Sequence, residues 1–165
     1  MRLVTSSNGA RHVSTASSLG ALSAQFRAAA EPALGDLVGR HRAEMAGPFW
    51  MRLPAPLFLA VTGMPGWVGK EFASPDSPDA DELVGHNLID DRGVAEPSLP
   101  MRARVATSRL DGRAAAVLTY APDAPFPWRN VVDEVRPLAD GRLLGISYNI
   151  VPGVPVGVPF LLHHE

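Results

Sequence analysis

The stretch "MRARVATSRLDGRAAAVLTYA", residues 101–121, decides the fold. Two runs that alternate like strands flank the Asp-Gly dipeptide at 111–112, which supplies the positive φ that a two-residue hairpin turn requires. The run "NVVDEVRPLADGRLLGISYNI", residues 130–150, repeats the pattern around Asp-Gly at 140–141. Consecutive strands joined by tight turns predict an antiparallel meander, and closing the meander into a barrel leaves no edge unpaired.

The remaining strand signals are shorter. Strand-like runs occupy residues 36–45, 66–73 and 158–165, whereas residues 54–63 fit either a strand or a short helix. Loops rich in proline separate the later strands, at residues 121–128 and 151–159. The sequence therefore predicts a mainly β protein, a single antiparallel barrel.

One helix is expected before the barrel, at about residues 15–31. It carries a narrow apolar stripe at i, i+3 and i+7, formed by Leu19, Leu22 and Phe26. Ser14 or Thr15 can cap its start. Because the stripe is narrow and the rest of the helix is rich in alanine, we expect the helix to pack against a larger body.

Length and composition indicate one domain. The 165 residues are 46% hydrophobic and 19% charged, which is ordinary for a globular protein and unlike a disordered one. We expect a flexible polar N-terminus at residues 1–13 and one barrel domain at residues 14–165, with strands from about residue 36 onward.

Composition also excludes several classes of function. A net charge of −2 and a pI near 6.2 give no electrostatic footprint for nucleic acid or an anionic membrane. Cysteine is absent, which removes disulfides, thiolate catalysis and cysteine metal sites. The N-terminus lacks the apolar core of a secretion signal, and no apolar run reaches membrane-spanning length, so we expect a cytoplasmic protein. Abundant Ala, Gly, Pro and Arg indicate a GC-rich bacterial genome.

Several motifs, taken together, resemble a known family. The runs "LVGRHRAEM", "LAVTGMPGWVGKEF" and "GHNLI" are similar to the bacterial and fungal GXWXG proteins with their companion domain of unknown function, DUF4334. The resemblance covers roughly residues 20 to 165, although Pro65 stands where the family has its first glycine. The matching positions are Trp67, Gly69, Lys70, Phe72, Asn87, Leu88, Arg102, Arg104, Tyr120, Pro125, Arg129, Leu144, Gly145 and residues 160–162.

A Trp-x-Gly signature on an opening strand also resembles the calycin barrels, which include lipocalins, fatty-acid-binding proteins and nitrobindins. This resemblance implies a lipocalin-like barrel with Trp67 as a plug at one end. The GXWXG family has little assigned activity, so the match implies a shape more than a mechanism.

Lys70 is the only lysine in the chain. The arginine-rich composition favours an outward surface charge, whereas an inward Lys70 would be a cation facing an acidic or enolic ligand and paired with Asp133 or Glu134. Lys70 lies three positions after Trp67, so on a regular strand the two side chains face opposite ways. Both are candidate ligand-binding residues.

Arg102 and Arg104 share one face of their strand. Such pairs usually face solvent. In the lumen they would clamp a carboxylate or a keto-enol oxygen, because guanidinium groups pair bidentately with oxygen atoms.

The run "VVDEVRP" carries the candidate acids. It presents Asp133 on one face and Glu134 with Arg136 on the other, and only one set can be inside. An acid among apolar neighbours is a candidate general acid or base. Tyr120 is a further catalytic candidate. Tyr148 and Arg136 are candidate ligand contacts.

The histidines carry no metal signature. His12, His41, His86, His163 and His164 do not form the spacings of a zinc site, and no phosphate loop or dinucleotide fingerprint is present. We therefore expect no cofactor and no metal. A nitrobindin-like haem barrel, with one histidine as the iron ligand, is the less favoured alternative.

These observations lead to two main hypotheses. The barrel could bind a hydrophobic, polyketide- or terpenoid-like molecule and act on it as a cofactor-free cyclase or isomerase of bacterial secondary metabolism. It could instead be a passive intracellular carrier of such a ligand. In both cases the partner is a small molecule, without nucleic acid or membrane, and the protein is a monomer or a homodimer.

Overall fold

A computed structural model describes residues 13–77 and 79–165 of the chain. Residues 1–12, which make up nearly all of the N-terminus predicted to be flexible, lie outside the described residues. Within the described part no helix is long and apolar enough to cross a membrane.

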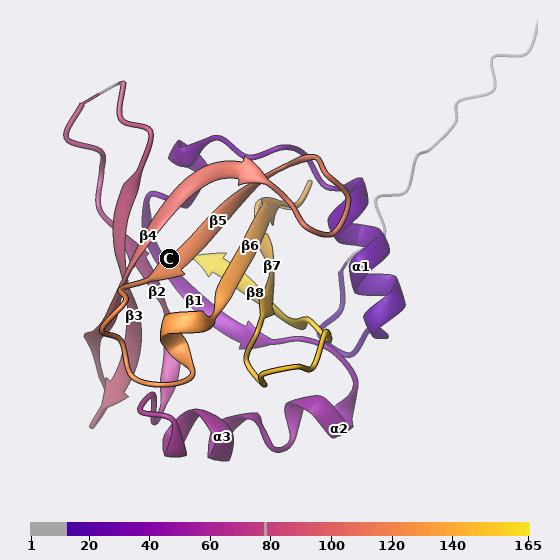
Figure 1. Ribbon diagram of the computed structural model, residues 1–165, viewed down its shortest axis with the longest axis vertical. Coiled ribbons are helices and arrows are strands. Elements are labelled where there is room, and N and C mark those ends of the chain that lie inside the picture. Colours follow the sequence, from indigo (N-terminus) through magenta and orange to yellow (C-terminus); the bar gives the residue numbers. More distant parts are fainter. Residues whose placement is uncertain (1–12, 78) are drawn as a thin grey trace, which may run out of the picture.

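Eight antiparallel strands form a closed barrel in which each strand pairs with its neighbours in the sequence and the last pairs with the first (Figure 1). This confirms the predicted mainly β, antiparallel barrel. The strands are β1 (Gly39–Met45), β2 (Trp67–Phe72), β3 (Leu83–Asp91), β4 (Val94–Thr107), β5 (Ala114–Tyr120), β6 (Val132–Pro137), β7 (Leu143–Tyr148) and β8 (Val158–His164).

The two Asp-Gly dipeptides lie between strands as predicted, but the loops are longer than a two-residue turn. Gly112 and Gly141 both have positive φ, 74° and 84°. Six residues, 108–113, separate β4 from β5, because tertiary contacts hold a wider loop there. The Asp111 carboxylate turns back to the guanidinium of Arg136 on β6.

Helix α1 (Leu19–Ala28) packs on the outer wall of the barrel (Figure 1). It is shorter than the predicted 15–31, and Ser18 caps it instead of Ser14 or Thr15: the Ser18 hydroxyl accepts a hydrogen bond from the amide of Ala21 at 3.2 Å. Leu22 and Phe26 are buried in an apolar cluster with the outward side chains of β7 and β8.

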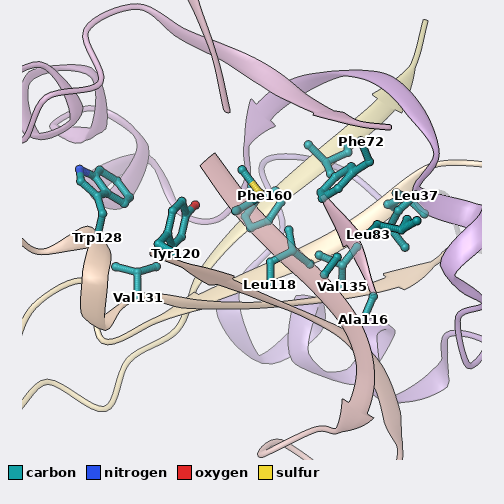
Figure 2. Packing of buried hydrophobic residues seen from close by; sticks show 14 of the residues in the cluster. Leu37, Phe72, Leu83, Ala116, Leu118, Tyr120, Trp128, Val131, Val135 and Phe160 are labelled. Atoms are coloured by element: carbon teal, nitrogen blue, oxygen red, sulfur yellow. The ribbon is translucent and has the colours of Figure 1, made fainter. Parts of the chain in front are cut away.

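The lumen holds the main core (Figure 2). Leu37, from the short 3₁₀ helix η1 (Leu34–Leu37), lies with Leu83 at one end, and Trp128, from η2 (Trp128–Asn130), lies with Tyr120 towards the other end. Inward residues of all eight strands fill the space between them. The η1 end is therefore packed solid with apolar side chains.

Two short helices lie against the barrel near the end at which η2 lies. α2 (Phe49–Arg52) and α3 (Ala55–Val61) connect β1 to β2 and run along the outside of the barrel on the side where η2 lies (Figure 1). The Trp128 indole donates a hydrogen bond to the Thr62 carbonyl at 2.7 Å, which fixes the end of α3 against η2. Of the two readings of residues 54–63, the helix is therefore the one adopted.

Candidate functional site

A β-bulge brings Trp67 and Lys70 to the same face of β2. Trp67 pairs with Ile89 on β3 and Lys70 pairs with Asn87, with a register shift between Trp67 and Gly69. Ile89 and Asn87 are two residues apart and so share a face, and their partners share it too. The prediction that Trp67 and Lys70 face opposite ways was wrong, because the bulge adds a residue between them.

Gly69 is required by this geometry. A Cβ at this position would overlap the carbonyl oxygen of His41 on β1. The glycine of the Trp-x-Gly run thus allows two backbones to approach closely beside the bulge.

Lys70 is an inward cation. Its side chain is 2% exposed, so the surface interpretation favoured by composition was wrong. The ammonium donates to three oxygen atoms: Oδ1 of Asn87 at 2.9 Å, the hydroxyl of Tyr120 at 3.0 Å and Oδ2 of Asp133 at 2.9 Å. All three ammonium hydrogens therefore have acceptors.

The acceptors of Lys70 are linked to one another. The Tyr120 hydroxyl donates to Oδ2 of Asp133 at 3.2 Å and accepts from the amide of Asn87 at 3.3 Å. Ser147 donates to the other carboxylate oxygen of Asp133 at 2.6 Å. The Trp67 indole donates to Oδ1 of Asn87 at 3.1 Å. The result is a connected polar network contributed by five strands.

Burial and nearby charges fix the protonation states of Lys70 and Tyr120. Burial by itself lowers the pKa of Lys70, but the Asp133 carboxylate and the Tyr120 oxygen outweigh it, so the pKa lies above its usual value of 10.5. Burial foremost, and then the Asp133 carboxylate, raises the pKa of Tyr120 to about 12, although Lys70 acts in the opposite direction. At neutral pH Lys70 is therefore a cation and Tyr120 a neutral hydrogen-bond donor.

The network forms the polar floor of a cavity of about 240 Å³. The other walls are almost entirely apolar, and they come from the barrel lumen, from η2, from the loop before β8 and from α2 and α3. The lining residues are Met45, Met51, Pro54, Ala55, Phe58, Leu59, Met64, Trp67, Lys70, Asn87, Tyr120, Trp128, Asp133, Ser147, Ile150, Val151, Val158 and Phe160.

Aromatic rings border the buried cation. The Lys70 ammonium lies 5.7 Å from the ring centre of Trp67 and 5.5 Å from that of Phe160. These rings meet edge to face, with their centres 5.9 Å apart. Trp67 therefore lines the cavity, and its role as a plug at one end of the barrel stays a prediction.

Glu134 and Arg136 lie on the outer face of β6, away from this cavity. Glu134 accepts from the Ser108 hydroxyl and from the backbone amide of Arg109 at 2.9 Å, so it orders the β4–β5 loop. Arg136 forms a bidentate ion pair with Asp111, with both N–O distances at 2.7 Å. The assignment of Glu134 as a catalytic residue and Arg136 as a ligand contact is corrected: both join β6 to neighbouring segments.

The side chains of Tyr148 and of the two arginines of β4 also lie outside the lumen. Tyr148 faces outward from β7 beneath the guanidinium of Arg109, 4.7 Å from the ring centre, and borders a groove of about 230 Å³ beside α1. Arg102 and Arg104 are exposed, and Arg102 pairs with Glu82 at the surface. The lumen-facing interpretation of these arginines is corrected, since their strand places Met and Ala inside.

Of the candidate residues, the structure brings together Asp133, Tyr120, Trp67 and Lys70. Sequence reasoning missed Asn87 and Ser147 as members of the site. Asn87 carried a signal, because asparagine is depleted in strands and one inside a strand calls for a hydrogen-bonding reason. Ser147 carried no such signal, because its alternation with Ile146 does not show which of the two side chains faces the lumen.

None of the described histidines lines the cavity. His41 is buried at the packed end of the barrel, where its ring bonds the Leu37 carbonyl at 2.8 Å, and His163 pairs with Glu44 on the outer wall. In residues 13–77 and 79–165 no three His, Asp or Glu side chains are grouped so that they could hold a metal ion. A haem ligand of the nitrobindin kind therefore has no histidine available in this cavity.

Comparison with known proteins supports the fold. A crystal structure of a protein from Thermomonospora curvata aligns with a TM-score of 0.55 at 19% identity, over 85% of this chain and 82% of the other. No family model and no curated protein matches the chain. The resemblance to the GXWXG and DUF4334 proteins stays a prediction.

Proposed function

We propose that the protein is a lipocalin-like barrel that binds a hydrophobic small molecule in its lumen. The observation that carries the proposal is an apolar cavity of about 240 Å³ whose floor is a buried, fully hydrogen-bonded Lys70–Asp133 pair. Small-molecule sites combine such walls with a few fixed polar groups that orient the ligand. The polyketide- or terpenoid-like ligand expected from the sequence fits this description.

The charge of the floor favours an uncharged ligand. Lys70 and Asp133 neutralise each other 2.9 Å apart, and the ammonium has no hydrogen left for another acceptor. An ionised carboxylate in the cavity would have to break the pair or remain without a cation, which is costly in a buried site. A neutral hydroxyl can instead donate a hydrogen bond to a lone pair that Asp133 or Ser147 leaves free.

A pair of fluorescent probes tests this preference. N-phenyl-1-naphthylamine is uncharged, and anilinonaphthalene sulfonate is an anion of similar shape. We expect the neutral probe to bind the purified protein at least tenfold more tightly than the anion. Equal or stronger binding of the anion would contradict the proposed ligand class.

Two tryptophan substitutions on α3 then locate the site. Ala55→Trp places a bulky ring into the cavity wall, whereas Ala60→Trp adds the same ring at an exposed position of the same helix. Binding of the neutral probe should be lost in the first variant and kept in the second. Mass spectrometry of a solvent extract of the protein purified from its native source would identify the ligand itself.

A catalytic role, as a cofactor-free isomerase or cyclase, is the second candidate, and the position of Asp133 beside Lys70 and Tyr120 favours it. A carboxylate there would take a proton from the carbon next to a substrate carbonyl. The ammonium and the phenol each donate one hydrogen to Asp133, and as the carboxylate takes up the proton these two hydrogens would turn to the oxygen on which the negative charge develops. Lys70 stays protonated, so it acts as a donor and not as a nucleophile.

Exchange of carbon-bound hydrogen in D₂O separates the enzyme from the passive carrier. A neutral ketone that binds the cavity should gain deuterium next to its carbonyl only if Asp133 moves the proton. The double variant Lys70→Met/Asp133→Asn keeps the cavity near its shape and should abolish the exchange. Binding without any exchange would leave the carrier role. The cytoplasmic location and the link to secondary metabolism stay predictions.

A further inference from the structure

The outward surface of α2 and α3 is an exposed apolar patch, called here the lid face. Its members are 65–74% exposed, which is unusual for large apolar side chains grouped within thirteen residues. They are Phe49, Trp50, Leu53, Leu57 and Val61. Large apolar side chains that are exposed together on one short segment mark an interaction site.

The lid face also lacks negative charge. Residues 46–66 contain no acid and a single charged residue, Arg52, although the chain has 17 acidic residues among 165. The neighbouring segment 149–162, which exposes Val151 and Val154, has no charged residue at all. The mouth loop 121–130 carries one charge of each sign, Asp123 and Arg129.

Arg52 has no acidic partner among the described residues. No acidic side chain of residues 13–77 or 79–165 forms an ion pair with it, and its Nε atom is buried without a hydrogen-bond partner. Other arginines of the barrel, such as Arg102, Arg113 and Arg136, are paired with carboxylates. A guanidinium beside exposed Trp and Phe side chains is suited to a phosphate headgroup above an apolar layer.

We propose that the lid face docks onto the surface of a lipid bilayer. Exposed tryptophan and phenylalanine with a flanking arginine and no acid is the pattern of a segment that lies at a membrane interface. A second copy of the chain is a poorer fit, because a stable interface takes about 20–30 residues a side and the lid face has five. The net charge of −2, which argued against a membrane partner, bears on long-range attraction and not on burial of apolar side chains.

Docking would place the bilayer next to the cavity. The same helices line the cavity with Met51, Ala55 and Phe58 on their inner side. Movement of this thin layer at the membrane opens a path between the acyl region and the lumen, so an apolar ligand need not cross water. This consequence rests on the proposed ligand-binding function, whereas docking itself does not.

Vesicle sedimentation tests the docking. The full chain is mixed with vesicles of phosphatidylcholine alone and of phosphatidylcholine with phosphatidylglycerol. We expect binding to both, with tighter binding to the anionic vesicles. The variant Trp50→Ser/Leu57→Ser should bind about a hundredfold more weakly, since it removes two large apolar side chains and burial of each contributes about a factor of ten.

Two matched variants control the experiment. Val84→Ser/Val94→Ser removes exposed apolar residues from strands outside the lid face and should bind as the wild type does. Arg52→Gln should weaken binding to anionic vesicles more than binding to neutral ones. Absence of wild-type binding to both vesicle types would overturn the proposal, as would a dimer in sedimentation equilibrium that becomes monomeric in the Trp50→Ser/Leu57→Ser variant.

The neutral-probe assay separates this inference from the proposed function. The Trp50→Ser/Leu57→Ser variant leaves the cavity lining intact, so it should bind the probe as the wild type does. Probe binding without vesicle binding would refute docking alone. Vesicle binding without probe binding would refute the ligand-binding function and leave docking in place.

Discussion

Removing one partner of the Lys70–Asp133 pair should destabilise the protein much more than removing both. Lys70→Met leaves a buried carboxylate without its cation, and Asp133→Asn leaves a buried ammonium without its anion. Breaking a buried pair in this way costs about 3–5 kcal/mol, whereas replacing both charges together is often close to neutral. The double variant Lys70→Met/Asp133→Asn should therefore lie within about 2 kcal/mol of the wild type.

Proton uptake or release sets an upper limit on each single loss. At pH 7, neutralising a carboxyl group with an ordinary pKa of about 3.9 costs about 4 kcal/mol, because each pH unit is worth about 1.4 kcal/mol. Neutralising a lysine with an ordinary pKa of about 10.4 costs about 5 kcal/mol by the same reasoning. These limits agree with the cost of breaking a buried pair, so the melting temperature should fall by roughly 6–20 °C in either single variant.

The two single variants should respond to pH in opposite directions. The Lys70→Met deficit shrinks as the pH falls from 7 towards 4, because the stranded carboxyl group takes up a proton more cheaply. The Asp133→Asn deficit shrinks as the pH rises towards 10, because the stranded ammonium loses its proton more cheaply. The double variant carries neither charge and should show neither trend.

Urea unfolding followed by tryptophan fluorescence measures all four proteins, with Arg102→Met as the control for an exposed ion pair. That control breaks the pair with Glu82 and should change stability by no more than about 0.5 kcal/mol. The cycle should give a coupling energy of about 3 kcal/mol or more. Single losses below about 1 kcal/mol that simply add in the double variant would refute the buried pair.

Three further predictions follow from the same contacts. Lys70 is the only lysine, so an amine-specific label should react with the N-terminus of the folded protein and with Lys70 only after unfolding; rapid labelling of Lys70 would contradict its burial. The chain has two tyrosines, and burial first of all raises the pKa of both Tyr120 and Tyr148 to about 12. Tyrosine in the unfolded chain ionises near pH 10.0, so the unfolded state loses these protons before the folded state does. The stability of the protein should therefore fall as the pH rises from about 10 to 12. Absorbance of tyrosinate in the folded protein near pH 10 would contradict this prediction. Gly145→Ala would drive a Cβ into the Phe160 ring and should cost about 1–3 kcal/mol in urea unfolding, whereas a neutral effect would show that the ring can move aside.

The barrel could be predicted because Asp-Gly dipeptides mark its turns and because strands with a solvent-exposed outer face alternate apolar and polar residues. In β4 the alternation of Met101, Arg102, Ala103 and Arg104 reports an inner apolar face and an outer face in water. Placing Arg102 and Arg104 in the lumen went against this pattern, and the structure follows the pattern. When one face of a strand is exposed to solvent, the alternation of its residues shows which face is buried.

The orientation of β6 could not be predicted, for a physical reason. Its outer face is covered by α1 and the β4–β5 loop, so residues 133–136 are buried on both sides. Burial on both faces removes the alternation that would have told Asp133 from Glu134. The acid in the lumen is identified only by its partner, Lys70. The position of Lys70 relative to Trp67 depends on a bulge, for which Gly69 inside β2 was a signal that the sequence analysis did not use.

The single lysine in an arginine-rich chain is explained by the shape of its site. Asn87, Tyr120 and Asp133 lie on three different strands and converge on one atom at 2.9–3.0 Å, which suits the three hydrogens of a compact ammonium. A guanidinium is planar and presents its donors as a fork, as Arg136 does towards Asp111 on the outer wall. It could not direct three bonds from one point to three strands, and its extra bulk would enter the cavity. Arginine therefore occupies the outer-wall site, where one carboxylate accepts two parallel hydrogen bonds from a guanidinium. Lysine occupies the lumen site, where three acceptors surround one compact ammonium.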